Sequence, residues 1–430
     1  MNITALKGFK DILPEEALLW QRIEATAREV FRRFGFREIK VPILEKTTLF
    51  ARSIGETTDI VEKEMYTFVD RNGESLTMRP EGTASVLRAF IEHSLHGQQP
   101  VQKLFTIGPM FRHERPQKGR LRQFHQMSVE VLGADQPELD AEIMAMAAMV
   151  MTGLGLAVSL EINSLGCPDC RPAFNRALLD FLEDKQDSLC EDCQRRRLKN
   201  PLRVLDCKSS TCQAHYRSAP SILDHLCQGC SDHFKTVQQG LTTMQIPYRI
   251  NSFMVRGLDY YTRTTFELLT DTLGAQSAVG AGGRYDSLIT QLGGPDLPGI
   301  GFAMGMERLV LMLQQQEAAL APAQSGLFIA ALGERARAAG FSMAHALRCQ
   351  GMAVQMDYAG ASLKSQMKQA GRLNCRHTLI IGDNELTQGE GTLRDMATRE
   401  QETIALPQAD LDLWAKEFAH SIELAVSVNG

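Results

Sequence analysis

Hydrophobic positions recur at helical spacing near the start of the chain and alternate further on. Residues 15–34 place apolar side chains on one helical face, which predicts a helix. Residues 40–50 contain a proline and are expected to be extended or to form an edge strand. Two short runs, 66–69 and 75–78, flank an Asn-Gly turn and predict a hairpin. A helix is expected to begin shortly afterwards, with Thr83 or a neighbour as its cap.

Two longer strands, 103–114 and 123–133, are predicted to pair across the loop 115–122. Alternation on the second strand gives it one apolar face, made of Met127, Val129 and Val131. Its other face carries an aromatic ring, an amide, a hydroxyl and a carboxylate, from Phe124, Gln126, Ser128 and Glu130. This polar face is either a solvated surface or one wall of a site.

The stretch 143–160 lacks charged residues and has the length of a membrane span. Gly153 and Gly155 divide it, and the second part alternates, so a buried helix followed by a buried strand is the better interpretation. Residues 171–245 are helical in pattern, charged and rich in cysteine, which indicates an inserted domain. Strands are expected again at 254–270.

After these strands, the pattern predicts a short strand at 299–302 and an apolar helix at 304–313. A segment of linker composition follows at 314–326. Strand and helix patterns then alternate up to the end of the chain, which predicts a separate α/β domain. We therefore expect a first domain over 1–320, containing the insertion, and a second over 327–430.

Composition narrows the class of protein. The 430 residues include 44% hydrophobic and 23% charged residues, values typical of a globular protein of two or three domains at roughly 150 residues each. The net charge is −5, which excludes a protein that binds nucleic acids unselectively through a uniformly basic surface. A local basic site is still compatible with this charge. The N-terminus lacks the pattern of a signal peptide, so we expect a cytoplasmic protein with no membrane association. No P-loop, HExxH or GxSxG motif occurs.

Basic residues gather at the loop before the second long strand. Five occur within eleven positions, namely Arg112, Arg115, Lys118, Arg120 and Arg122. Such a loop suits a polyphosphate or a nucleic-acid backbone, although a solvated hairpin tip has the same composition. A further arginine, Arg308, follows Glu307 in the apolar helix, where burial would require either a salt bridge or a phosphate as its partner.

Two adjacent tyrosines, Tyr260 and Tyr261, follow Arg256 in the run Arg-Gly-Leu-Asp-Tyr-Tyr-Thr. If this run is a strand, the two rings point to opposite faces, so at most one lines any given cleft and the other belongs to the core.

Eight of the ten cysteines fall between residues 167 and 230 as four close pairs: Cys167/Cys170, Cys190/Cys193, Cys207/Cys212 and Cys227/Cys230. Three pairs have CxxC spacing, which places two thiolates at corners of a zinc tetrahedron. Four pairs could build one or two structural zinc sites, and free thiols are the alternative. Because disulfides are uncommon in the cytosol, we do not expect them.

These motifs, in this order, resemble the class II aminoacyl-tRNA synthetases and specifically the histidyl-tRNA synthetases, over essentially the whole chain. Residues 40–50 resemble the first class motif, residues 111–126 the strand–loop–strand second motif, and residues 299–309 the third. The runs 256–262 and 79–83 resemble those of the histidine enzyme. The resemblance implies an α+β fold: an antiparallel sheet with flanking helices, a helical insertion, and a C-terminal α/β anticodon-binding domain.

The resemblance also implies the reaction. Histidine and ATP, with Mg²⁺, would form histidyl-adenylate and pyrophosphate, and the histidyl group would then pass to tRNA(His), in a homodimer whose interface includes the first motif. Arg112 would hold the α-phosphate and act in catalysis with Arg256. The other ATP contacts would involve Glu114 at the adenine amino group, Phe124 stacked on the adenine ring, Arg308 at the adenine and γ-phosphate, and Arg120.

Histidine recognition has a physical basis in the imidazole itself. The neutral ring has one donor and one acceptor, which a carboxylate and a phenol can satisfy, and analogues that lack either group leave the site's polar groups stranded. By resemblance, Glu130 and Tyr261 fill these roles, with the α-amino and carboxylate ends held by Glu81, Thr83 and Gln126. The remaining histidine-site positions are Gly82, Arg112, Arg256 and Tyr260.

Two alternatives share parts of these motifs. The regulatory subunit of ATP phosphoribosyltransferase binds histidine without charging tRNA, but it would lack the ATP arginines and residues 327–430. A synthetase for proline or threonine would lack the run 256–262. Zinc does not follow from the resemblance, because many members of the family have the insertion without these cysteine pairs, so the zinc prediction depends on spacing alone.

Overall fold

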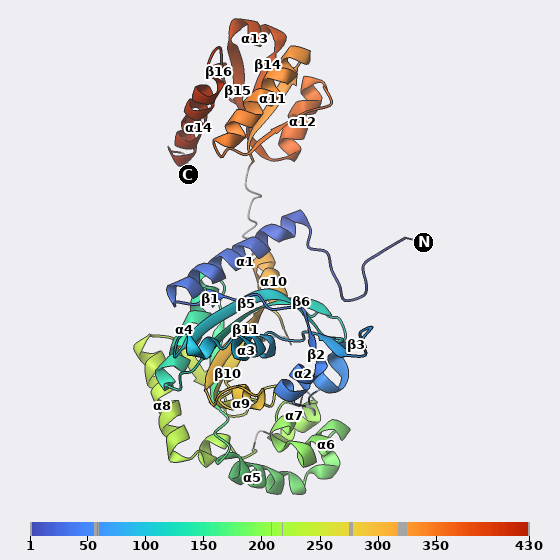
Figure 1. Cartoon of the computed structure of the whole chain (residues 1–430), viewed down its shortest axis with the longest axis vertical. Helices are drawn as coiled ribbons and strands as arrows, with labels where there is room; N and C mark the ends of the chain where they lie inside the picture. The colour runs from blue at the N-terminus through green and yellow to red at the C-terminus, as the bar shows by residue number, and fades with distance from the viewer. Residues whose placement is uncertain are drawn as a thin grey trace. The chain divides into compact units, whose positions relative to one another are not determined.

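The computed structural model describes residues 2–55, 58, 60–207, 209–216, 218–274, 278–316 and 325–428. The chain forms two compact units, Met1–Ala318 and Ala319–Gly430 (Figure 1). Most of the predicted linker lies outside the described residues.

The larger unit is built on a sheet of eight described strands in the order β1-β5-β6-β11-β10-β9-β7-β8. Their bounds are β1 Arg37–Glu38, β5 Gln102–Phe111, β6 Gln123–Leu132, β7 Ser159–Ser164, β8 Tyr248–Ile250, β9 Thr262–Leu269, β10 Ala278–Arg284 and β11 Gly299–Gly305. The central pairs, from β5 to β7, are antiparallel, and the two outermost pairs are parallel. The predicted class of fold is thus confirmed.

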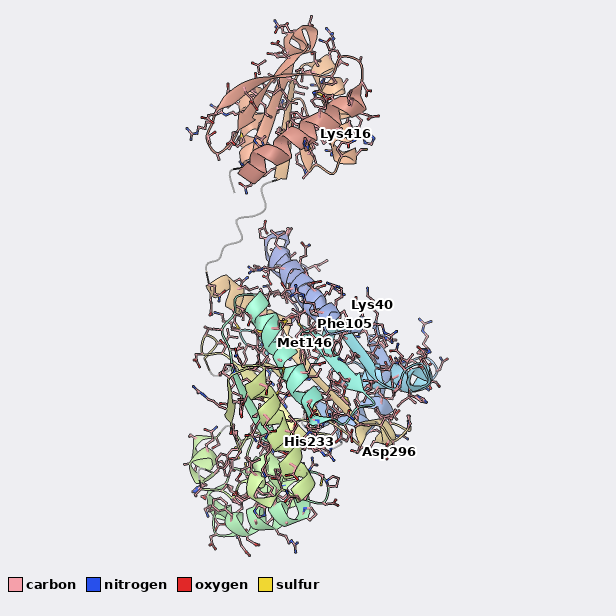
Figure 2. All side chains as sticks on the ribbon, turned by 90° about the vertical axis from the view of Figure 1, so that its left-hand side faces the viewer. Lys40, Phe105, Met146, His233, Asp296 and Lys416 are labelled. Atoms are coloured by element: carbon pink, nitrogen blue, oxygen red, sulfur yellow. The ribbon has the colours of Figure 1, made fainter. Side chains whose placement is uncertain are left out.

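The predicted faces of β6 are also confirmed. Met127, Val129 and Val131 are fully buried in the main core, against apolar side chains of four helices. These helices are α1 Pro14–Arg33, α4 Pro137–Gly153, α8 Gln228–Thr243 and α10 Met306–Gln315. Figure 2 shows α4 and α8 side by side over the sheet, with Met146 on α4. The uncharged stretch 143–160 is this buried helix and the start of β7, and no described helix is long and apolar enough to span a membrane.

The other face of the sheet is covered by shorter elements. The hairpin at 66–69 and 75–78 is confirmed, and it forms a small sheet in the order β2-β4-β3. The elements are β2 Leu44–Lys46, β3 Tyr66–Val69, β4 Ser75–Met78, α2 Thr47–Ile54, α3 Thr83–Glu92 and α9 Leu288–Gln291. The chain also contains a π-helical turn at Ile60–Glu64 and 3₁₀ turns at Leu95–Gly97, Gln186–Ser188, Pro201–Val204 and Ile222–His225.

Three sequence-based expectations need correction, and a fourth becomes more specific. Residues 40–50 are extended only as far as Lys46, because α2 begins at Thr47. The helix after the hairpin begins at Thr83, so its cap is the neighbouring residue Gly82. Residues 254–261 form turns and coil rather than a strand, which begins only at Thr262. The glycine-rich strand β10 was missed, because three glycines in seven residues give no hydrophobic alternation.

The insertion contains three helices that lie beyond one end of the sheet, and α8, which returns to pack on α4 (Figure 1). The first three are α5 Arg171–Glu183, α6 Glu191–Lys199 and α7 Ser210–Tyr216. They enclose a small core of their own, around Phe174, Leu178, Val204 and Tyr216.

The smaller unit has a five-stranded sheet in the order β13-β12-β14-β15-β16, with three parallel strands and an antiparallel hairpin. Its elements are β12 Ser325–Leu332, α11 Glu334–Cys349, β13 Val354–Met356, α12 Leu363–Arg372, β14 Cys375–Gly382, α13 Asp383–Gln388, β15 Glu390–Asp395, β16 Gln401–Ala405 and α14 Leu411–Val428. It has a separate hydrophobic core, which includes Ile329, Leu347 and Leu379.

Candidate active site

A cavity of about 310 Å³ opens on the polar face of β6. Most of the predicted site residues line it, namely Glu81, Thr83, Arg112, Glu114, Arg120, Phe124, Gln126, Arg256, Tyr260, Tyr261 and Arg308. Glu130 and Gly82 lie behind this lining. The polar face of β6 is therefore a wall of the cavity and not a solvated surface.

Glu81 holds the start of α3. Its carboxylate accepts hydrogen bonds from the backbone N–H groups of Thr83 (2.7 Å) and Ala84 (2.8 Å), so Glu81 supplies the side-chain capping expected of Thr83 or a neighbour. Gly82 leaves no room for a side chain, because a Cβ there would come within 2.9 Å of Ser128 Oγ. Burial raises the pKa of Glu81, although both backbone hydrogen bonds oppose the shift.

Glu130 is almost fully buried one layer below the cavity. Its Oε1 accepts a hydrogen bond from Thr83 Oγ1 at 2.7 Å, and its Oε2 accepts one from the Tyr285 hydroxyl. Gly301 on β11 makes room for this carboxylate, since a Cβ there would clash with Oε2. Burial raises the pKa of Glu130 to about 8, so the group is mostly protonated at neutral pH.

Three tyrosines cluster at the same end of the cavity. The ring centroids of Tyr260 and Tyr261 are 4.7 Å apart, and that of Tyr285 lies 5.7 Å from Tyr260. Both adjacent tyrosines line the cavity, so the expectation that at most one could do so is wrong. The strict alternation of a strand does not apply, because the pair lies in a loop before β9. Tyr285 was missed, since it follows the unrecognised strand β10.

The buried proton of Glu130 leads to a prediction about stability. The folded state retains this proton up to about pH 8, whereas an unfolded glutamate loses it near 4.5. The free energy of unfolding should therefore fall between these pH values, by up to about 5 kcal/mol from this group. Glu130→Gln, which cannot ionise, should be the more stable form at pH 8 and should lack this part of the fall.

Urea unfolding between pH 5 and 9 tests this expectation. Trp20 reports on the larger unit once the other tryptophan is removed by Trp414→Phe in both proteins. Parallel pH profiles for the parent protein and for Glu130→Gln would contradict it.

Two arginines are fixed at the centre of the cavity wall. Arg112 Nε donates to the Pro80 carbonyl at 2.8 Å, and its guanidinium carbon lies 5.3 Å from the centre of the Phe124 ring. Arg256 forms an ion pair with Glu267 on β9, and its guanidinium lies 5.6 Å from the centre of the Tyr261 ring. Burial lowers the pKa of Arg112. In Arg256, Glu267 and the tyrosines outweigh burial, so its pKa is raised.

The basic loop divides into two parts. Arg120 turns inward and forms an ion pair with Glu114, whereas Arg115 and Lys118 are exposed at the tip. Arg115 and Lys118 thus fit a solvated tip, whereas phosphate binding by Arg120 stays a prediction. Arg308 also reaches the cavity and donates to the Ala278 carbonyl.

The carboxylate of Glu307 contacts His125 and not the neighbouring Arg308. It accepts hydrogen bonds from the backbone N–H of His125 at 2.9 and 3.0 Å. Gln126, on the next position of β6, lines the cavity with a buried amide oxygen that has no hydrogen-bond partner among the described residues. An unsatisfied buried acceptor of this kind is suited to a ligand that donates a hydrogen bond.

The eight cysteines of the insertion lie outside the cavity and form two groups. One consists of Cys167, Cys170, Cys227 and Cys230, and the other of Cys190, Cys193, Cys207 and Cys212. Within each group, the sulfur atoms all lie within 4.8 Å of one another. None of the eight forms a disulfide.

Comparisons with known proteins identify relatives of both units of the chain. Residues 8–309 match the histidyl-tRNA synthetase family model, and residues 326–410 match that of an anticodon-binding domain. A histidine--tRNA ligase of Desulfotalea psychrophila is 58% identical over 412 residues, which cover 96% of this chain and 95% of that protein. One of Geobacter sulfurreducens is 58% identical over 405 residues, covering 94% and 97%.

The apo histidyl-tRNA synthetase of S. aureus has a similar structure. The two chains are 37% identical with a TM-score of 0.82, and the match covers 97% of this chain and 100% of that one. The anticodon-binding domain and the arginines of the cavity argue against a regulatory subunit that does not charge tRNA. The chain therefore belongs to the histidyl-tRNA synthetase family, the ligases that charge tRNA(His) with histidine.

Proposed function

We propose that the tyrosine end of the cavity binds the histidine side chain and that the arginine side binds ATP. The buried polar groups at the tyrosine end carry this proposal. Glu130 retains a proton, and Tyr260, Tyr261 and Tyr285 supply hydroxyls that can donate or accept. We assign Tyr261 and Glu130 to the two imidazole nitrogens, with Thr83 and Tyr285 fixing the orientation of the Glu130 carboxyl.

The opposite end of histidine would meet polar groups already in place. The free amide oxygen of Gln126 suits the α-ammonium group, which Glu81 can also attract. The α-carboxylate would then point toward Arg112 and Arg256. This direction is required for chemistry, because the carboxylate is the nucleophile that attacks the α-phosphate of ATP.

ATP would lie along the arginines. Phe124 presents its ring beside Arg112, which suits stacking of adenine, and Glu114 can accept from the adenine amino group. Arg112 would hold the α-phosphate, with Arg120 and Arg308 nearer to the terminal phosphates. Mg²⁺, when bound, would neutralise charge on the phosphates.

We further propose a homodimer that works in the cytoplasm, with structural zinc in the insertion. The small sheet β2-β4-β3 supports the dimer, because Ile43, Leu44, Phe68 and Val69 expose apolar surface there.

ATP–pyrophosphate exchange with each of the twenty amino acids tests the assignment of the cavity. Exchange is expected with histidine alone. Gln126→Ala should raise the KM for histidine about tenfold or more, because a charge-assisted hydrogen bond would be lost. Exchange with another amino acid, or an unchanged KM, would contradict the proposal.

The second unit is expected to contribute to tRNA binding and not to adenylation. A chain that ends at Pro322 should retain pyrophosphate exchange, since every residue assigned to histidine and ATP precedes it. Its kcat/KM for tRNA charging should fall ~10-fold or more, because the tRNA would then contact only the first of two linked units. Loss of exchange by a folded, dimeric truncation would show that the two units do not act separately.

A further inference from the structure

The two cysteine groups have the dimensions of zinc tetrahedra. Four thiolates around one zinc at ~2.3 Å place neighbouring sulfur atoms about 3.8 Å apart. Cys167 Sγ lies 3.6 Å from Cys170 Sγ and 3.9 Å from Cys227 Sγ. In the other group, Cys190 Sγ lies 3.7 Å from Cys207 Sγ. These separations are far longer than the ~2.05 Å of a disulfide bond.

The surroundings of the sulfur atoms also suit thiolates. Backbone N–H groups point at them, from Cys227 to Cys170 Sγ at 3.1 Å and from Cys190 to Cys212 Sγ at 3.3 Å. Such hydrogen bonds stabilise negative charge on ligand atoms and orient them. Five of the eight cysteines are buried, three of them in the second group, and each group offers four sulfur ligands, which would fill the coordination of one zinc ion. A structural site has this closed form, whereas a catalytic one keeps an open position.

We propose that each group binds one structural zinc ion, and that the two ions together brace the loop 255–261 that carries Tyr260 and Tyr261 into the histidine site. The proposal rests on the function assigned to that cavity, but the metal content and the rigidity of the loop can be measured independently of it.

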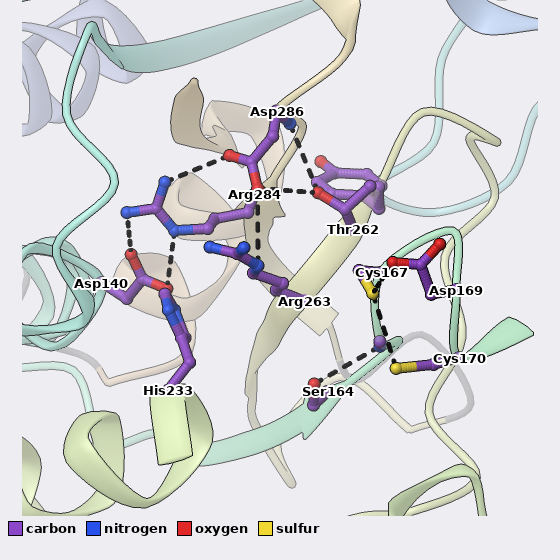
Figure 3. Close-up of polar contacts among 12 residues, drawn as sticks. Asp140, Ser164, Cys167, Asp169, Cys170, His233, Thr262, Arg263, Arg284 and Asp286 are labelled. Carbon is purple, nitrogen blue, oxygen red and sulfur yellow. Dashed lines mark hydrogen bonds and ion pairs between the residues drawn. The ribbon is translucent and has the colours of Figure 1, made fainter. Parts of the chain in front are cut away.

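The first group, Cys167/Cys170/Cys227/Cys230, closes the base of the insertion. Cys167 and Cys170 lie on the turn that follows β7 (Figure 3). The preceding residue, Gly166, accepts a backbone hydrogen bond from Arg263 at 2.9 Å, and Leu165 donates one to the Arg263 carbonyl at 2.7 Å. Arg171, directly after Cys170, donates to the Tyr261 carbonyl. The group is thus connected to the C-terminal end of the loop.

The second group, Cys190/Cys193/Cys207/Cys212, holds the segment that contacts the middle of the loop. This segment lies between Cys193 and Cys207. Its Arg203 donates to Asp259 Oδ1 at 3.1 Å and to the Gly257 carbonyl at 2.6 Å, and Asn200 donates to the same Asp259 oxygen at 3.0 Å. Asp259 therefore pairs with residues of the insertion and not with Arg256.

The insertion needs the metal because its own core is small. Three cysteines of the second group, Cys193, Cys207 and Cys212, are members of that core, so loss of the ion would leave thiols where the helices converge. Small domains with so little apolar interior commonly depend on a metal for folding. Without zinc, Arg203 and Arg171 would no longer be held against the loop.

Metal content gives the first test. Full-length protein purified without chelator should contain two zinc ions per chain by elemental analysis. Cobalt in place of zinc should give the thiolate charge-transfer and d–d bands of a tetrahedral sulfur site. Cys227→Ser/Cys230→Ser and Cys193→Ser/Cys212→Ser should each remove one ion and leave the other. A content below two in the parent protein, or loss of both ions in each variant, would overturn the assignment of two separate sites.

Hydrogen exchange gives the second test. The peptide over 255–263 should exchange faster in zinc-depleted protein and in both double variants, because the amide of Arg263 and the contacts to Asp259 lose their support. The KM for histidine in pyrophosphate exchange should rise ~10-fold or more, as expected when binding groups are misplaced. Re-addition of zinc should reverse both changes in the depleted parent.

Two controls separate the brace from general damage. Cys349→Ser, at an exposed cysteine of α11, should change neither zinc content nor exchange. Arg203→Met should retain both ions yet still loosen the peptide 255–263, because it removes the link and not the metal. The proposal that the insertion supports the loop would be overturned if hydrogen exchange of the peptide 255–263 is unchanged both in Arg203→Met with normal zinc content and in zinc-depleted protein. That result would leave the proposed histidine site untouched.

Discussion

Arg256→His is expected to lower the rate of histidyl-adenylate formation by ~10²-fold or more, with little change in histidine affinity. As the histidine carboxylate attacks the α-phosphate, negative charge develops on the oxygen atoms of the five-coordinate phosphorus. Arg256 lines the cavity and is fixed by Glu267 and by the Tyr261 ring, so its charge is positioned before the reaction. A pre-positioned charge acts mainly where new charge appears, which lowers the barrier more than it tightens ground-state binding.

Single-turnover measurements of the two steps test this role. Transfer to tRNA from preformed adenylate should be much less affected than adenylate formation. Glu267→Gln is the matched control, because it breaks the ion pair but leaves the guanidinium in place. If Arg256 acts only through that ion pair, the two variants should show equal reductions in the rates of both steps. That result would contradict the catalytic assignment. Asp259, three residues after Arg256, pairs instead with Arg203.

Asp140→Asn is expected to reduce the free energy of unfolding of the larger unit by about 3–5 kcal/mol. Asp140 on α4 is fully buried, and its carboxylate contacts Arg284 at the end of β10 (2.7 Å) and His233 on α8 (2.8 Å), as Figure 3 shows. Arg284 is also fully buried and donates to the Ala134 and Gln136 carbonyls. Removal of the Asp140 charge leaves the buried Arg284 with the partly exposed Asp286, at 3.2 Å, as its remaining carboxylate partner.

Urea unfolding monitored through Trp20, in the Trp414→Phe background, measures this loss. The control lies on the same helix: Glu142→Gln removes a partly exposed ion pair with Lys103 and should cost less than ~1 kcal/mol. Equal effects of the two substitutions would show that the buried network adds no more than a surface pair. Because His233 belongs to α8, exchange in the insertion should also rise in Asp140→Asn.

The sequence was most informative where local order and chemistry coincide. The alternation of β6 identified Phe124, Gln126 and Glu130 as one face, because side chains on a strand point alternately to opposite sides whatever the strand packs against. The hairpin at 66–78 followed from its turn residues for the same local reason. The order of the motifs along the chain was sufficient to indicate the family, which the comparisons confirm.

Other features depended on residues distant in sequence. Tyr285 and the glycines of β10 carry no periodic signal, and Gly301 is required only because the Glu130 side chain lies across the neighbouring strand. Asp140 and Arg284 are 144 positions apart, and each by itself resembles an ordinary surface charge.

The sequence by itself thus determined which side chains share a strand face, where the hairpin at 66–78 turns, and which family the chain resembles, because these depend on neighbours within a few residues or on the order of the motifs. Only the tertiary structure decided that both adjacent tyrosines enter one cavity, that Glu130 keeps its proton, and which cysteine pairs meet. The physical reason is that burial, desolvation and the approach of sulfur atoms from Cys167 to Cys230 are set by packing between segments tens of residues apart.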